Sequence, residues 1–186
     1  MGTYTKIPQA TFDELQLEAG VLLKTFDPSN PTITDTAIVT ATTGGFQISA
    51  TPTFSDLGED VDNCPENTKE LKHLDSWEVT ASTTALGTST EVIKFALGVA
   101  DIDSNDATKV TPRRDLKQSD FRDLWWVGDR ADGGFVAAKL INALSTGGLS
   151  LQTSKNSKGQ TSLTITCHPS ITAQDVVPIE FYSVEA

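Results

Sequence analysis

Apolar and polar residues alternate along most of this chain, which is the pattern of half-buried β-strands. In one such stretch, the apolar side chains of Phe46, Ile48 and Ala50 would share one face of a strand. Asp132-Gly133 lies between two strand patterns and is typical of a tight hairpin turn. The clearest predicted strands are residues 46–50, 77–82, 124–128, 135–144, 162–167 and 176–182. The whole pattern predicts about eight short strands.

Residues 88–98 carry the signals of one short helix. Thr88 and Glu91 have the spacing of a capping box, in which each side chain satisfies a backbone N–H of the other's residue. Gly98 can end the helix in a left-handed conformation. Because a helix this short is marginal alone, we expect it to pack on the strands. A weaker helical pattern covers residues 66–74.

These elements predict a single domain over residues 1–186 that is mainly β. The expected architecture is a β-sandwich or barrel of two packed antiparallel sheets, with one flanking α-helix and a long loop arm. The arm covers residues 51–75, between two strand patterns. A connection of this length is uncommon in a compact domain and is usually functional or disordered.

The predicted arm combines negative charge with apolar residues. Its carboxylates are Asp56, Glu59, Asp60, Asp62, Glu66, Glu70 and Asp75. Its apolar residues are Phe54, Leu57, Val61, Leu71 and Leu74. Purely disordered segments lack such apolar anchors, so we interpret the arm as a docking element.

The composition of the chain narrows the classes of function that we expect. The chain has 14 Lys and Arg against 25 Asp and Glu, a formal net charge of −11. Tight binding to nucleic acid depends on basic residues, so this balance argues against a nucleic-acid-binding protein. The sequence shows no secretory signal and no apolar run long enough to cross a bilayer, so we expect a cytoplasm-like compartment and no membrane insertion. Two cysteines, Cys64 and Cys167, are expected to be free thiols.

The sequence offers no catalytic constellation. His73 and His168 are its only histidines and lack the spacing of a metal site. Residues 60–63 faintly resemble a calcium loop but lack its sixth-position glycine. Dense carboxylates can support acid–base chemistry, although they more often form a solvated face. We expect no enzyme activity, no metal and no cofactor.

Two further stretches are candidates for contacts. Residues 1–27 form an expected N-terminal docking segment, in which Leu15, Leu17 and Val21 would share one face if extended. Trp125 and Trp126 are adjacent, so in a strand they face opposite sides and one is expected in the core.

Several stretches resemble the major tail proteins, or tail tube proteins, of long-tailed bacteriophages, especially those of Gram-positive hosts. The resemblance covers residues 15–28, 43–79, 123–153 and 173–182. Its most specific parts are Gly-Glu-Asp-Val-Asp-Asn at 58–63 and Trp-Trp-Val-Gly-Asp at 125–129.

The resemblance implies a structural virion protein with the phage tail tube fold. Such proteins form hexameric rings, which stack into a hollow tube through which DNA is ejected without specific binding. The implied partners are other copies of the chain, with the tape measure, tail terminator and distal tail proteins. The implied location is the virion tail, assembled in the host cytoplasm.

An assembly of this kind needs surfaces for contacts between subunits and a surface that faces the lumen. Candidates for contacts between subunits or rings are Leu15, Leu17, Val21, Phe54, Asp56, Leu57, Glu59, Asp60, Asp62, Glu66, Leu71, Arg113 and Arg114. Candidates for the lumen, whose acidic wall would repel phosphate, are Ser150, Gln152, Ser162, Thr164 and Thr166. These five could equally be ordinary outward-facing positions. Two other classes remain open: a monomeric β-sandwich binding or adhesin module, and a small hydrolase that uses clustered carboxylates.

Overall fold

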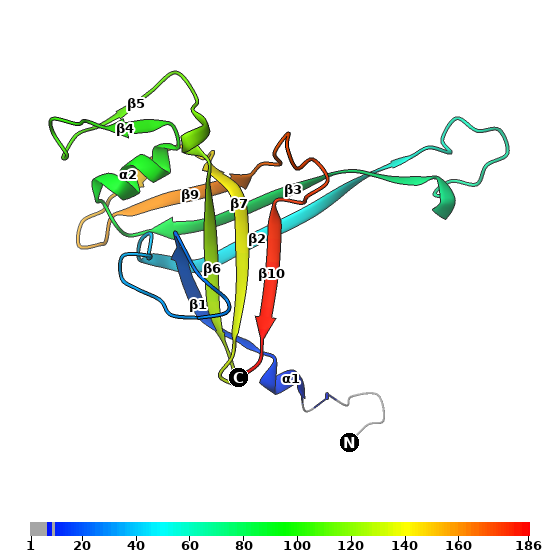
Figure 1. The fold of residues 1–186 in the computed structure, drawn as a ribbon, viewed down its shortest axis with the longest axis horizontal. Coiled ribbons are helices and arrows are strands. Elements are labelled where there is room, and N and C mark those ends of the chain that lie inside the picture. Colours follow the sequence, from blue (N-terminus) through cyan, green and yellow to red (C-terminus); the bar gives the residue numbers. More distant parts are fainter. Residues whose placement is uncertain (1–6, 9) are drawn as a thin grey trace.

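The fold is mainly β, as the sequence predicts (Figure 1). The computed structural model describes residues 7–8 and 10–186. Its helices are α1 (Ala10–Asp13) and α2 (Thr90–Leu97), with short 3₁₀ turns η1 (Lys69–Leu71) and η2 (Gln118–Asp120). Its strands are β1 (Gln16–Leu23), β2 (Thr42–Asp56), β3 (Lys72–Ala85), β4 (Ala100–Ile102), β5 (Val110–Pro112), β6 (Arg122–Arg130), β7 (Phe135–Ser145), β8 (Ser150–Gln152), β9 (Gln160–Cys167) and β10 (Ile179–Val184).

Eight strands form one antiparallel sheet, and β4 and β5 form a small second sheet. The order in the large sheet is β1-β6-β7-β9-β3-β2, with β10 paired to β7 and β8 paired to β9. The large sheet turns a corner, so that β6, β7 and β10 run across the direction of β2, β3 and β9 (Figure 1). The two packed layers of the predicted sandwich are therefore the two halves of one continuous sheet.

Strand β7 makes the corner. Its first part, up to Leu140, pairs with β10, and its last three residues, from Ala143, pair with β9. Between them Asn142 has φ +48°, in the left-handed region, and the pairing of β6 with β7 shifts nearby. The Asn142 N–H donates to the Asp123 carboxylate (3.1 Å), and its side-chain amide donates to the His168 carbonyl (3.0 Å). This bulge bends β7 so that it can belong to both layers.

The main core lies between the two layers and under α2. Its fully buried side chains include Leu22, Val79, Leu124, Leu140, Leu163 and Ile165. Helix α2 adds Val92, Phe95 and Ala96 to this core. The helix is capped one residue later than predicted: the Ser89 hydroxyl, not that of Thr88, accepts from the Val92 N–H. Gly98 ends it at φ +71°, as expected.

A second, smaller core covers the other face of β1, β6 and β7. The segment from residue 24 to 41 crosses this face and places Phe26 against Trp125 and Phe135, with ring centroids 5.6 and 5.4 Å apart. Trp125 is buried here, while Trp126 points to the opposite side and stacks on Phe46. The expectation for the two tryptophans is therefore confirmed.

The predicted arm is largely a β-hairpin, which corrects two expectations. Strand β2 continues to Asp56 and strand β3 begins at Lys72, so only residues 57–71 connect the strands. The helix predicted over 66–74 is wrong: only Lys69–Leu71 forms a 3₁₀ turn, and the rest of that stretch enters β3 or a turn. The hairpin projects well beyond the body of the molecule (Figure 1).

Candidate assembly surfaces

An apolar stripe runs from the core onto the arm. Cross-strand partners share a face of a sheet, so the pairs Ala50–Val79, Pro52–Trp77 and Phe54–Leu74 lie on one side of the β2–β3 hairpin. Val79 is buried in the main core. Farther out, Trp77, Leu74 and Phe54 are 37%, 44% and 52% exposed. The core-facing side of the hairpin therefore continues past the core, where the described residues of the chain cover these three side chains only in part.

The end of the arm is an ordered loop. The Asp56 carboxylate accepts the backbone N–H of Gly58 (2.9 Å) and of Asn67 (2.8 Å). These two hydrogen bonds, helped by the nearby Lys72, hold the pKa of Asp56 below its usual value despite a small opposing effect of desolvation. The Lys72 ammonium donates to the Asn67 side chain (2.9 Å). The arm therefore presents its side chains in a defined arrangement.

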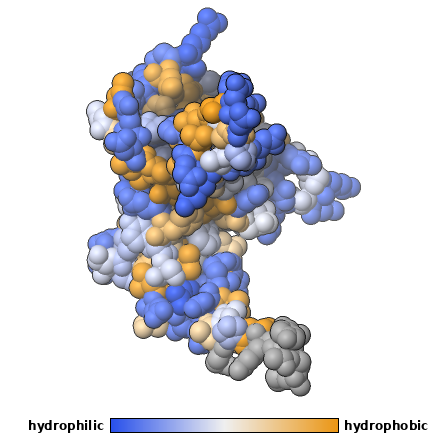
Figure 2. All heavy atoms as spheres, turned by 90° about the vertical axis from the view of Figure 1, so that its right-hand side faces the viewer, coloured by the Kyte–Doolittle hydropathy of each residue, from blue (hydrophilic) through white to orange (hydrophobic). Residues whose placement is uncertain are grey.

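The structure brings most of the arm candidates together on this loop. Leu57, Glu59, Asp60, Asp62 and Glu66 are exposed there. Leu71 is half-buried against Gly58, where an added Cβ would lie 2.9 Å from its side chain. Figure 2 looks from the side to which the arm projects and shows hydrophobic patches among the hydrophilic surface. The arm and the surface around it thus combine charge with uncovered apolar side chains.

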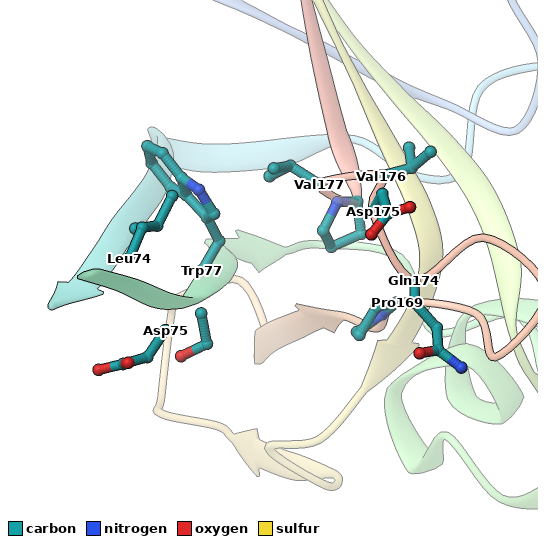
Figure 3. A pocket seen from close by; sticks show the side chains of 10 residues that line it. Leu74, Asp75, Trp77, Pro169, Gln174, Asp175, Val176 and Val177 are labelled. Atoms are coloured by element: carbon teal, nitrogen blue, oxygen red, sulfur yellow. The ribbon is translucent and has the colours of Figure 1, made fainter. Parts of the chain in front are cut away.

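A groove of about 420 Å³ lies at the base of the arm. One wall is Leu74 to Trp77 of β3, and the other is the segment from Gln174 to Pro178, with Pro169 beside it (Figure 3). Asp175 places a carboxylate on the second wall, whereas the Asp75 side chain points away from that wall and its carboxylate accepts from the Ser55 hydroxyl (2.5 Å). The groove joins residues about a hundred positions apart in the sequence, and no local pattern marks Val176 and Val177 as its wall.

The lumen candidates lie together on one face. Ser162, Thr164 and Thr166 alternate along β9 with the buried Leu163 and Ile165. Ser150 pairs with Ser162 and Gln152 with Gln160, so the β8 candidates join the same face. Neighbouring β3 adds Thr80, Ser82 and Thr84, which pair with Thr166, Thr164 and Ser162. The outer face of β3, β9 and β8 is thus rich in hydroxyl groups and lacks charged side chains at these positions.

The N-terminal candidates lie along β1. Leu17 pairs with Asp129 and Val21 with Val127, so both side chains share one face across an intervening bulge. Leu15 and Leu17 are exposed, whereas Val21 packs on the second core. The bulge needs Gly20 at φ +70°, because a Cβ there would lie 2.6 Å from the Trp126 indole nitrogen. Residues 1–6 and 9 of the expected docking segment lie outside the described residues.

Arg113 and Arg114 have different environments. The Arg113 side chain is 11% exposed and pairs with Asp101 (2.8 Å), Asp120 and Asp115 of its own chain. Burial opposes ionisation of Asp120, but the Lys117 N–H and the Arg113 guanidinium outweigh it and lower its pKa. Arg113 therefore fastens the β4–β5 region to η2, and Arg114, which is exposed, is the better contact candidate.

The chain matches no protein-family model, and no curated protein is similar to it in sequence. Among solved structures, a chain from the virion of a native gene transfer agent (GTA) particle aligns with 89% of this chain and 96% of its own length. The identity is 11% and the TM-score is 0.39. None of the described helices is long and apolar enough to cross a membrane.

Proposed function

We propose that this chain is a structural virion protein of the tail tube type, whose copies form hexameric rings that stack into a hollow tube for DNA ejection. The single observation that carries the proposal is the uncovered apolar stripe of Trp77, Leu74 and Phe54 on an ordered, projecting hairpin. Monomeric proteins rarely leave contiguous apolar side chains uncovered, so such a stripe indicates a protein–protein contact. The resemblance of residues 43–79 and 123–153 to tail tube proteins supplies the type of assembly.

The sheet edges support self-association. Within the described residues, β2 and β10 each pair with a strand on one side only. An exposed strand edge offers unpaired N–H and C=O groups to another chain. In a ring, edge-to-edge joining of neighbouring sheets would satisfy these groups and form a continuous wall.

The hydroxyl-rich face of β3, β9 and β8 supports a role as the wall of a channel. Ser162, Thr164 and Thr166 carry no positive charge that would hold DNA phosphates. The net charge of −11 per chain disfavours DNA binding further. In this proposal DNA passes without specific contacts, and the chain has no catalytic role. The proposed partners are further copies and the tape measure, terminator and distal tail proteins, in a virion tail assembled in the host cytoplasm.

Negative-stain electron microscopy of the purified chain, with size-exclusion chromatography and light scattering beside it, tests the proposal. We expect hollow rings or tubes that grow more numerous with protein concentration. A chain that stays monomeric at every concentration and ionic strength would contradict the proposal and favour a monomeric binding module. Filaments without a central channel would support self-association and contradict the tube.

A further inference from the structure

The core-facing side of the sheet is uncovered at both ends of β3. At the arm end, Leu74 and Trp77 extend the apolar face past the core. At the other end, β9 begins and β8 pairs with it, and Leu151 lies opposite the buried Thr161. Leu151 therefore shares the core-facing side, yet it is 52% exposed. The same face of one sheet thus ends in two separate uncovered apolar patches.

The two patches differ in charge. The groove beside Trp77 carries the exposed Asp175 carboxylate on one wall. The turn after Leu151 carries Lys155 and Lys158, both exposed. In the part of the chain that the structure describes, no ion pair includes either lysine. One end is therefore apolar and acidic, and the other is apolar and basic.

One copy cannot join its own two patches. Trp77 at the groove and Ala85 beside Thr161 are eight residues apart on β3, so the two patches are separated by at least about 26 Å at 3.3 Å per residue. Figure 1 shows the arm and the start of β9 at opposite ends of the long axis of the molecule. A contact between two different patches on two copies is heterologous, and repeated contacts of this kind close into rings or extend as filaments.

We propose that the groove at the base of the arm binds the β8–β9 hairpin of a second copy. The Leu151 side chain of that copy enters between Trp77 and Val176, and its Lys155 and Lys158 face Asp175. This inference rests on the proposed self-assembly and names the two surfaces that meet. The contact would pair one of the few basic surfaces of this strongly acidic chain with an acidic groove.

The competing occupant is the segment from Arg113 to Lys117. Leu116 is exposed there and Arg114 beside it is exposed too. However, Arg113 is buried in ion pairs of its own chain, and Lys117 already lies 3.4 Å from Asp101. Its basic groups are therefore less available than Lys155 and Lys158, which favours the β8–β9 hairpin as the occupant of the groove.

Chemical cross-linking tests the contact directly. In a Cys64→Ser background, Leu151→Cys and Val176→Cys are combined and treated with a short bis-maleimide under conditions in which the unmodified chain assembles. Cys167 stays silent, because burial and the nearby Asp123 raise its pKa to about 12. We expect a ladder of covalent oligomers from the pair and none from either single cysteine, since a heterologous contact brings different residues together.

Three outcomes would overturn this contact. A ladder from Leu116→Cys with Val176→Cys would assign the groove to the competing segment. Assembled particles without a ladder from the Leu151 and Val176 pair would remove the contact while leaving the proposed function intact. If the unmodified chain never assembles, the proposed function fails, and this contact fails with it.

Charge reversal provides an independent test. Lys155→Glu with Lys158→Glu should reduce assembly at least tenfold, and adding Asp175→Lys should restore a large part of it. A matched control, Lys24→Glu with Lys94→Glu, changes the net charge equally and should assemble like the unmodified chain. Because screening weakens exposed ion pairs, assembly of the unmodified chain should also fall as salt rises. Equal loss in both double variants would show a net-charge effect and overturn the pairing.

Discussion

The two halves of the β2–β3 hairpin have the same alternation of apolar residues but differ in what covers their apolar face. In the body, Ile48 and Val79 face the main core, and the helix and the other layer of the sheet cover them. On the arm, Phe54 and Leu74 occupy the same face of the same strands and remain exposed. Alternation of apolar residues thus identifies a face that is to be buried, but it does not identify what buries it.

The comparison separates folding from assembly. Apolar residues of the body stabilise the chain itself, because their burial is complete within one copy. Apolar residues of the arm stabilise only a state in which something covers them. If the proposed function holds, changes on the arm should leave the monomer intact and change its association, whereas changes in the body should do the reverse.

Removal of the arm end should have the largest effect, because it should abolish assembly and leave folding nearly unchanged. Replacing residues 57–71 by an Asn-Gly turn keeps the register of β2 and β3 up to Asp56 and Lys72. We expect a folded monomer whose Tm changes by only a few degrees and which forms no tubes, measured by circular dichroism and electron microscopy. Tubes of normal number and length would refute the role of the arm in assembly.

A matched pair of truncations sharpens the comparison. Leu163 is fully buried in the body, so Leu163→Ala should lower the free energy of unfolding by about 2–5 kcal/mol. Phe54→Ala on the arm should lower it by less than about 1 kcal/mol, because half of that side chain is already exposed. Urea unfolding of the monomers measures both. A large loss of stability from Phe54→Ala would mean that the arm belongs to the folding core.

The strands of the body could be predicted from the sequence because their alternation is regular. Residues 135–144 were expected as a strand and form Phe135–Ser145, and the Asp132-Gly133 turn joins it to β6 with Gly133 at φ +92°. Gly98 ends α2 as its position predicts. In each case local chemistry and the tertiary fold favour the same conformation.

The arm strands could not be predicted in the same way. The register shifts between Thr53 and Phe54, where one residue of β3 is extra, so alternation breaks beside Leu74. The charged residues of the arm then interrupt the apolar–polar alternation that would predict a strand. The groove of Trp77 and Val177 lay beyond sequence reasoning altogether, since it depends on where the segment before β10 returns to β3.

Two glycines of the body both have a positive φ but differ in the space around an added Cβ. Gly20→Ala forces a Cβ toward the Trp126 ring and the Val127 carbonyl at φ +70°, so it should destabilise the chain by about 2–3 kcal/mol. Gly44→Ala is the control, because φ is +78° there but nothing lies within 4 Å of the added Cβ. We expect a cost of about 1 kcal/mol at Gly44 from conformation alone. Equal costs in urea unfolding would show that the close approach at Gly20 relaxes freely.

Acidification should loosen the arm end before the body. The ionised Asp56 carboxylate holds the N–H groups of Gly58 and Asn67, and its pKa is lowered in the folded chain. Its stabilising contribution is therefore complete above the unfolded pKa of about 3.9 and is lost as pH falls through the lower, folded value. Amide exchange of Gly58 and Asn67 should become faster in that range, while the amides of β7 stay protected.

Two variants identify the carboxylate responsible for that loosening. Asp56→Asn should give fast exchange of the Gly58 and Asn67 amides already at neutral pH, because a neutral amide is a weaker acceptor. Asp106 is hydrogen-bonded in the same way to Thr108, in the loop between β4 and β5, and its pKa is also lowered. Asp106→Asn should therefore leave the arm amides unchanged. If Asp106→Asn also exposes them, the acid response belongs to the whole molecule, and the arm end is not an independent unit of stability.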